Sequence, residues 1–176
     1  ALEEGNRQKA KQLAEQNLVG PNNAQYGRYL SFGDIFMVFN NQKKGLENVT
    51  DYHRGLDISE AISTTSYTQD GTNFKRETFS SYPDDVTVTH LSKKGDKTLD
   101  FTLWNSLTED LIANGDYSWE YSNYKQGAVT TDSNGILLKG TVKDNGLKFA
   151  SYLGIKTDGQ VTAQDGYLTV TGASYA

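Results

Sequence analysis

Six dipeptides in which glycine follows aspartate or asparagine divide this chain into short segments. They are Asp70-Gly71, Asn114-Gly115, Asn134-Gly135, Asn145-Gly146, Asp158-Gly159 and Asp165-Gly166. Such pairs favour tight hairpin turns, because both residue types tolerate a positive φ. A chain interrupted this often has little room for long helices, so the pattern predicts an antiparallel sheet protein.

Runs of alternating apolar and polar residues lie between these turns and predict strands. The expected strands are 34–39, 56–69, 72–80, 86–92, 98–104, 117–124, 136–142, 147–156, 160–164 and 167–171. Strands at this spacing are typical of a sandwich or barrel, and only two prolines are present to interrupt them. We therefore predict an all-β fold, an antiparallel β-sandwich, as one domain over residues 1–176.

A single amphipathic segment at residues 6–19 departs from the strand pattern. Ala10, Leu13, Ala14 and Leu18 recur at helical spacing, with charged residues on the opposite face. Gly20-Pro21 follows as a helix stop, since glycine accepts the left-handed cap and proline cannot continue the helix. One short N-terminal helix is expected.

Two hairpins can be predicted in register. The first turns at Asp70-Gly71 and pairs Tyr67 with Phe74, Thr65 with Arg76 and Thr64 with Glu77. The second joins residues 86–89 to 99–103 through 93–96. In its second strand Leu99, Phe101 and Leu103 alternate with polar residues and are expected to face the core.

The stretch DYHRGLDISEA, residues 51–61, holds the densest group of potential acid, base and cationic side chains. An active site would need these groups to converge in a concave environment. On an extended chain, however, neighbouring residues point to opposite faces. Two interpretations stay open: a catalytic cluster, or the polar start of a strand in which Arg54 and Asp57 form an ion pair. In the second, His53 is a loop residue.

The sequence contains little evidence for a metal, cofactor, nucleic-acid or membrane site. His90 has no second histidine or cysteine at metal-ligand spacing, and the chain has no cysteine. We expect a strand histidine there, no metal and no cofactor. The net charge of −5 without a basic stripe argues against nucleic-acid binding, and no apolar run is long enough for membrane insertion.

The segment YSWEYSNY, residues 117–124, is the other candidate site. Period two places Tyr117, Trp119 and Tyr121 on one face. Such a row could stack on the apolar faces of sugar rings, or it could fill the sandwich core. Both readings remain open.

The order of these segments resembles the amino-terminal domain of glycoside hydrolase family 95, the α-L-fucosidases. The similarity covers residues 7–104 and is most specific in YHRGLDISEA (52–61) and FKRETFSSYPDDV (74–86). The positions that carry it are Tyr52, Arg54, Leu56, Asp57, Arg76 and Glu77.

This resemblance implies a super-sandwich type β-sandwich without catalytic residues of its own. In that family an inverting reaction takes place in a later (α/α)₆ barrel. The chain is then expected to be a fragment of a larger bacterial enzyme, contacting that barrel and reaching a glycan substrate through it. The enzyme would be secreted or held at the cell surface, although the charged start at Ala1–Glu4 shows no signal peptide.

Two alternatives to a hydrolase domain remain open, and both are binding functions. The aromatic segment would suit a stand-alone carbohydrate-binding module. A contiguous apolar surface patch would suit a surface adhesion module.

Overall fold

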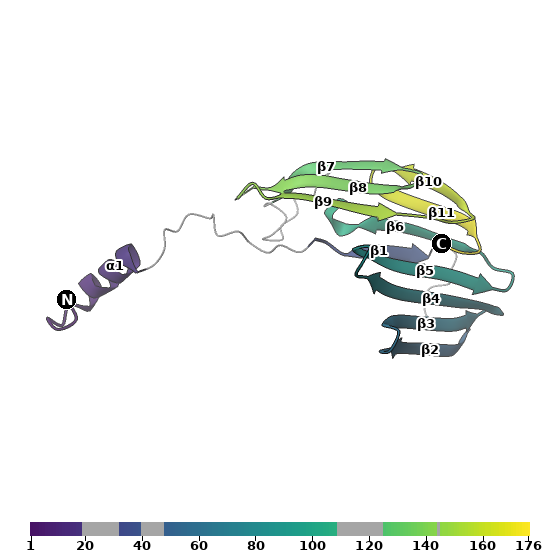
Figure 1. Ribbon diagram of the computed structural model, residues 1–176, viewed down its shortest axis with the longest axis horizontal. Coiled ribbons are helices and arrows are strands. Elements are labelled where there is room, and N and C mark those ends of the chain that lie inside the picture. The colour runs from purple at the N-terminus through teal and green to yellow at the C-terminus, as the bar shows by residue number, and fades with distance from the viewer. Residues whose placement is uncertain (19–31, 40–47, 109–124, 144) are drawn as a thin grey trace.

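The computed structural model describes residues 1–18, 32–39, 48–108, 125–143 and 145–176, and within these it is built almost entirely from antiparallel strands (Figure 1). Sheet A has the order β1 (Ile35–Phe39), β6 (Leu99–Asn105), β11 (Tyr167–Ala173), β10 (Gln160–Gln164). Sheet B runs β2 (Val49–Asp57), β3 (Ile62–Gln69), β4 (Thr72–Ser81), β5 (Val86–Lys94). Sheet C runs β7 (Lys125–Asp132), β8 (Gly135–Val142), β9 (Lys148–Gly154). The all-β prediction is confirmed.

The predicted helix is present as α1 (Arg7–Asn17). It begins at Asn6, whose side chain accepts a hydrogen bond from the Lys9 amide at 3.0 Å, an N-cap that satisfies one of the first free N–H groups. None of its residues is buried, so its amphipathic face contributes nothing to the core. The predicted stop at Gly20-Pro21 lies outside the described residues.

Of the five glycine dipeptides within the described residues, two form two-residue hairpin turns with positive φ at both positions. Asp70 and Gly71 have φ of 47° and 78° between β3 and β4, and Asp165 and Gly166 have 48° and 83° between β10 and β11. This geometry matches the right-handed twist of the strands it joins. The first hairpin has the predicted register, including Tyr67 opposite Phe74 with ring centroids 5.5 Å apart.

The second predicted hairpin is wrong: β5 pairs with β4, whereas β6 pairs with β1 and β11 in the other layer. The connection between them is attached to the β3–β4 turn. The Lys97 amide donates to Thr72 Oγ1 at 3.2 Å, and Lys97 Nζ lies 2.5 Å from Asp70 Oδ2. A Cβ at Gly95, where φ is 137°, would lie 2.8 Å from the Thr72 Cα. The loop therefore crosses from sheet B to sheet A.

The predicted strand 56–69 is also wrong, because a turn at 58–61 divides it into β2 and β3. The Asp57 carboxylate starts this turn by accepting the amides of Ser59 and Glu60 at 2.9 and 3.3 Å. Ala61 then takes a φ of 56°, which a non-glycine residue adopts only where the surrounding structure requires it. The expected strand 117–124 lies outside the described residues, and β7 was not predicted.

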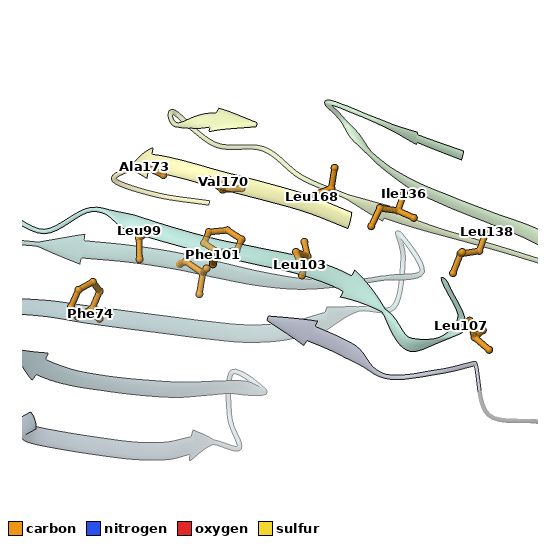
Figure 2. Packing of buried hydrophobic residues seen from close by; sticks show 11 residues of the cluster. Phe74, Leu99, Phe101, Leu103, Leu107, Ile136, Leu138, Leu168, Val170 and Ala173 are labelled. Carbon is orange, nitrogen blue, oxygen red and sulfur yellow. The ribbon is translucent and has the colours of Figure 1, made fainter. Parts of the chain in front are cut away.

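The core lies on one face of sheet A. Leu99, Phe101 and Leu103 point inward from β6, as predicted, together with Leu168 and Val170 from β11 (Figure 2). The same cluster includes residues of both other sheets, namely Phe74, Leu91, Ile136 and Leu138. Because the sheet A residues share one face, sheets B and C both pack against that face and complete a sandwich.

Replacing a core leucine should therefore cost far more than replacing an exposed one. Leu168 is 0% exposed, so we expect Leu168→Ala to lower the free energy of unfolding by about 2–5 kcal/mol. Leu56 is 64% exposed, so the matched Leu56→Ala should stay within about 0.5 kcal/mol. Urea unfolding checks both, and equal losses would contradict this core assignment.

Candidate functional site

The stretch DYHRGLDISEA forms most of β2 and the turn after it, on the outermost strand of sheet B. Residues 50–57 are all exposed, so the cluster does not lie in a concave site. A register shift between Thr50 and His53, with Asp51 at a φ of 52°, places a β-bulge at its start. His53 is thus a strand residue after the bulge, not a loop residue as expected.

The predicted ion pair between Arg54 and Asp57 does not form. Asp57 Oδ1 instead accepts the Ser59 hydroxyl at 2.7 Å, besides the amides of Ser59 and Glu60. These hydrogen bonds, chiefly that from the Ser59 side chain, lower the pKa of Asp57. Arg54 and Asp57 are three residues apart on a strand, so their side chains point to opposite faces.

The residues that carry the family resemblance are divided between the two faces of sheet B. The inner face is the face of Phe74 and Leu91, which belong to the core. Strand register places Arg54 and Arg76 on this face, on either side of Thr65. Glu77 lies on the outer face. Sequence neighbours such as Arg76 and Glu77 are therefore separated by the sheet.

Glu77 forms a small charged group on the outer face. Lys75 Nζ lies 2.7 Å from Glu77 Oε1, and His90 Nδ1 lies 3.8 Å from Oε2. The bond from Lys75 is the main cause of the lowered pKa of Glu77. His90 is a strand residue, as predicted, and its side chain is half-exposed. Exposed pairs of this kind contribute little to stability.

A row of three aromatic side chains crosses the face of sheet A that points away from the core. Phe36 on β1 stacks on Trp104 of β6, with ring centroids 5.2 Å apart and 22° between the ring planes. Tyr167 on β11 adds a third ring, 5.5 Å from Trp104. Phe36 is 44% exposed. The next row of the same face carries hydroxyls, with Thr102 and Thr169 oxygens 3.3 Å apart.

This aromatic row presents flat rings of the kind on which the apolar face of a sugar ring can stack. Its residues come from three strands that are distant in sequence, which is why period-two reasoning within one strand missed it. The signal available was the outward position of Trp104 in the alternation of residues 99–105. The predicted row of Tyr117, Trp119 and Tyr121 lies outside the described residues.

A pocket of about 560 Å³ opens between β5 and the segment 153–156 at the end of β9. Its walls are mainly apolar and include Met37 of β1, Leu91 of β5, and Phe101 and Leu103 of β6. His90 and Lys156 also line it. The pocket is thus an opening in the layer of sheets B and C that reaches the core-facing side of sheet A.

No three His, Asp or Glu side chains in the described ranges are grouped so that they could hold a metal ion. No described helix combines the length and the apolar character that a bilayer crossing requires.

Two comparisons with known proteins bear on the family of this chain. The model of the family described as "Glycosyl hydrolase family 65, N-terminal domain" matches residues 1–176, the full chain. The match supports a glycosyl hydrolase N-terminal domain and does not single out family 95. No curated protein matches the sequence.

The pKa of Asp57 provides a test of the turn that replaced the predicted ion pair. Because the folded pKa lies below the ordinary 3.8, the stabilisation by this carboxylate is fully present above pH 3.8. It is lost as the pH falls through the folded pKa. We expect Ser59→Ala to raise the pKa of Asp57 and Arg54→Ala to leave it unchanged, as measured by NMR titration. If Arg54→Ala also raised the pKa of Asp57, the unaltered protein would contain the ion pair after all, which would contradict the turn described here.

Proposed function

The chain belongs to the family of glycosyl hydrolase family 65 N-terminal domains, and on this basis we propose that it is a non-catalytic β-sandwich domain of a larger glycoside hydrolase. The match along the full chain is the observation that carries the proposal. The sandwich architecture agrees with such a role, because the described residues form a packed core, and Asp57, Asp70 and Asp158 lie at exposed turns and loops.

The state of the carboxylates supports a non-catalytic role. Glycoside hydrolysis needs a carboxylic acid whose raised pKa keeps it protonated, facing a second carboxylate across the substrate. Asp57, Glu77 and Asp158 all have pKa values below the ordinary ones, because each accepts hydrogen bonds as a carboxylate. They are therefore ionised at neutral pH and suit turns and ion pairs, not general acid catalysis.

For the parent enzyme we propose an inverting α-L-fucosidase, with catalysis in an (α/α)₆ barrel that the domain contacts. The resemblance of residues 7–104 to family 95 supports this finer proposal. The family 65 match supports only its coarser part, a glycosyl hydrolase N-terminal domain. The same resemblance supports a bacterial enzyme that is secreted or exposed at the cell surface and acts on glycans.

An apolar end of sheet B supports an interdomain contact. The turns 58–61 and 82–85 lie at the same end of the sheet, because β2 and β4 run in the same direction. Ile58 and Tyr82 in these turns are 87% and 98% exposed, and Phe79 and Val86 are also exposed nearby. Exposed apolar groups gathered at one edge are typical of a surface that another domain covers.

The fucosidase proposal predicts that the domain has no hydrolytic activity of its own. We expect purified residues 1–176 to release no free fucose from a fucosylated oligosaccharide, because no general acid of suitable pKa is found among the carboxylates discussed. A family 95 α-L-fucosidase serves as the positive control in the same free-fucose assay. Fucose release by the chain alone would overturn the non-catalytic role.

The aromatic row of sheet A favours a second candidate, carbohydrate binding. The C–H face of a pyranose is apolar and stacks on flat rings, and hydroxyls such as those of Thr102 and Thr169 offer hydrogen bonds beside it. Phe36, Trp104 and Tyr167 provide three rings across neighbouring strands. In this case the domain would hold glycan near the catalytic domain.

Calorimetric titration with a fucosylated oligosaccharide tests this candidate. We expect Phe36→Ala to weaken binding about tenfold, equivalent to about 1.4 kcal/mol, through loss of one stacking ring. Phe79→Ala, at an exposed phenylalanine of sheet B, is the matched control and should bind normally. If Trp119→Ala abolished binding and Phe36→Ala did not, the binding site would be the row of Tyr117, Trp119 and Tyr121 instead. No binding by the unaltered chain at millimolar sugar would reject both rows.

A further inference from the structure

The inner face of sheet B is covered by the core only in part. Phe74 of β4 and Leu91 of β5 are buried there, whereas Arg54, Leu56 and Arg76 on the same face are exposed. In Figure 1, β2 and β3 lie farthest from the strands of sheets A and C. The inner face of sheet B therefore continues beyond the core as an open surface.

Two arginines lie in one row of this open surface. The register places Arg54 of β2 opposite Thr65 of β3, and Thr65 opposite Arg76 of β4. Two strand spacings, about 10 Å, therefore separate the Cα atoms of the two arginines. Because arginine side chains are long, the space above Thr65 is within reach of both guanidinium groups. A single ligand group placed there can bind to both.

The two guanidinium groups have no partner of opposite charge in the part of the chain that the structure describes. Asp57 and Glu77 belong to the outer face, and no aspartate or glutamate occupies a paired inner-face position of β2 to β5. The whole chain has a net charge of −5, so this is a local property of one surface. An open surface with two arginines and no carboxylate favours an anion.

Hydroxyl groups occupy most of the neighbouring positions. The row next to the arginines carries Ser63, Thr78 and Thr89, and the following row carries Ser80 and Thr87. The hydroxyls of Thr78 and Thr89 lie 3.2 Å apart, and those of Ser80 and Thr87 lie 3.0 Å apart. Since a hydroxyl can donate and accept hydrogen bonds, these rows suit the hydroxyl groups of a sugar. The centre of a protein interface is typically more apolar.

A recess of about 80 Å³ lies where the open surface meets the covered part of the same face. Thr65 and Arg76 line it from sheet B, and Phe39 and Leu99 line it from sheet A. A recess of this volume has room for several water molecules, since one needs about 10–15 Å³. A carboxylate group therefore fits beside Arg76, while the sugar ring that carries it stays on the open surface.

We propose that Arg54, Thr65 and Arg76 bind the carboxylate of an acidic sugar, a hexuronic acid residue, on the inner face of sheet B. Each guanidinium offers the planar pair of N–H donors that a carboxylate accepts in a bidentate manner. The Thr65 hydroxyl donates between them, and Ser63 and Thr78 in the next row bind hydroxyl groups of the ring. The inference rests on the proposed function in one respect, that a glycan carries the carboxylate.

The test compares methyl β-D-glucuronide with methyl β-D-glucoside, which has a hydroxymethyl group in place of the carboxylate. NMR titration follows the Nε–H signals of Arg54 and Arg76 and the amide of Thr65. We expect the glucuronide to shift all three signals with one saturation curve, and the glucoside to leave them unchanged. Acetate lacks the hydroxyl groups of the ring, so it should need about tenfold higher concentrations for the same shifts.

Substitutions test whether both arginines hold the same ligand. Arg54→Gln and Arg76→Gln should each weaken glucuronide binding about tenfold, because each removes one pair of charge-assisted hydrogen bonds. Both side chains are exposed, so the thermal unfolding of the variants should match that of the unaltered chain. Arg7→Gln, at an exposed arginine of α1, is the matched control and should bind normally.

Several outcomes would contradict the proposal. If the glucuronide caused no shift, or if either Arg54→Gln or Arg76→Gln bound it normally, the two arginines would not share this ligand. Equal saturation by acetate and the glucuronide would exclude a contribution from the sugar. Tighter binding of N-acetyl-glutamate N-methylamide would assign the surface to an acidic polypeptide instead. Fucose release by the chain would overturn the non-catalytic role and leave these titrations unaffected.

Discussion

The inward face of β6 is the contact on which the rest of the structure depends. Leu99, Phe101 and Leu103 are buried by sheets B and C together, and β6 also holds β1 and β11 on either side. Burial of such side chains contributes about 1.5–3 kcal/mol each, which is large against the small net stability of a domain. The sandwich is organised around this strand because it is central within its sheet and faces both other sheets.

Polar side chains then stabilise the places where the chain turns, both within sheet B and between sheets C and A. Asp57, Asp70 and Asp158 lie at three such places, and each accepts hydrogen bonds from neighbouring turn or loop groups. Their carboxylates lie outside concave surfaces and stabilise local geometry. The stretch 51–61, rich in charged residues, is an example: it begins with a β-bulge on an exposed strand, and its Asp57 accepts the backbone hydrogen bonds of the turn that follows.

The two candidate binding features lie on different parts of the sandwich. The aromatic row is on the face of sheet A that points away from the core, whereas the pocket beside β5 reaches the core-facing side of the same sheet. Sheet A therefore separates the two features.

The sequence by itself determined the elements whose information is local. The β3–β4 register follows from Asp70-Gly71, the burial of Leu99, Phe101 and Leu103 from their alternation with polar residues, and the presence of α1 from its apolar spacing. It did not determine that β5 and β6 separate, because their hairpin pattern is overridden by the contacts of Gly95 and Lys97 with Thr72 and Asp70. Nor could it bring Phe36, Trp104 and Tyr167 into one row. Strand pairing between distant segments depends on long-range packing, and only the tertiary structure decided it.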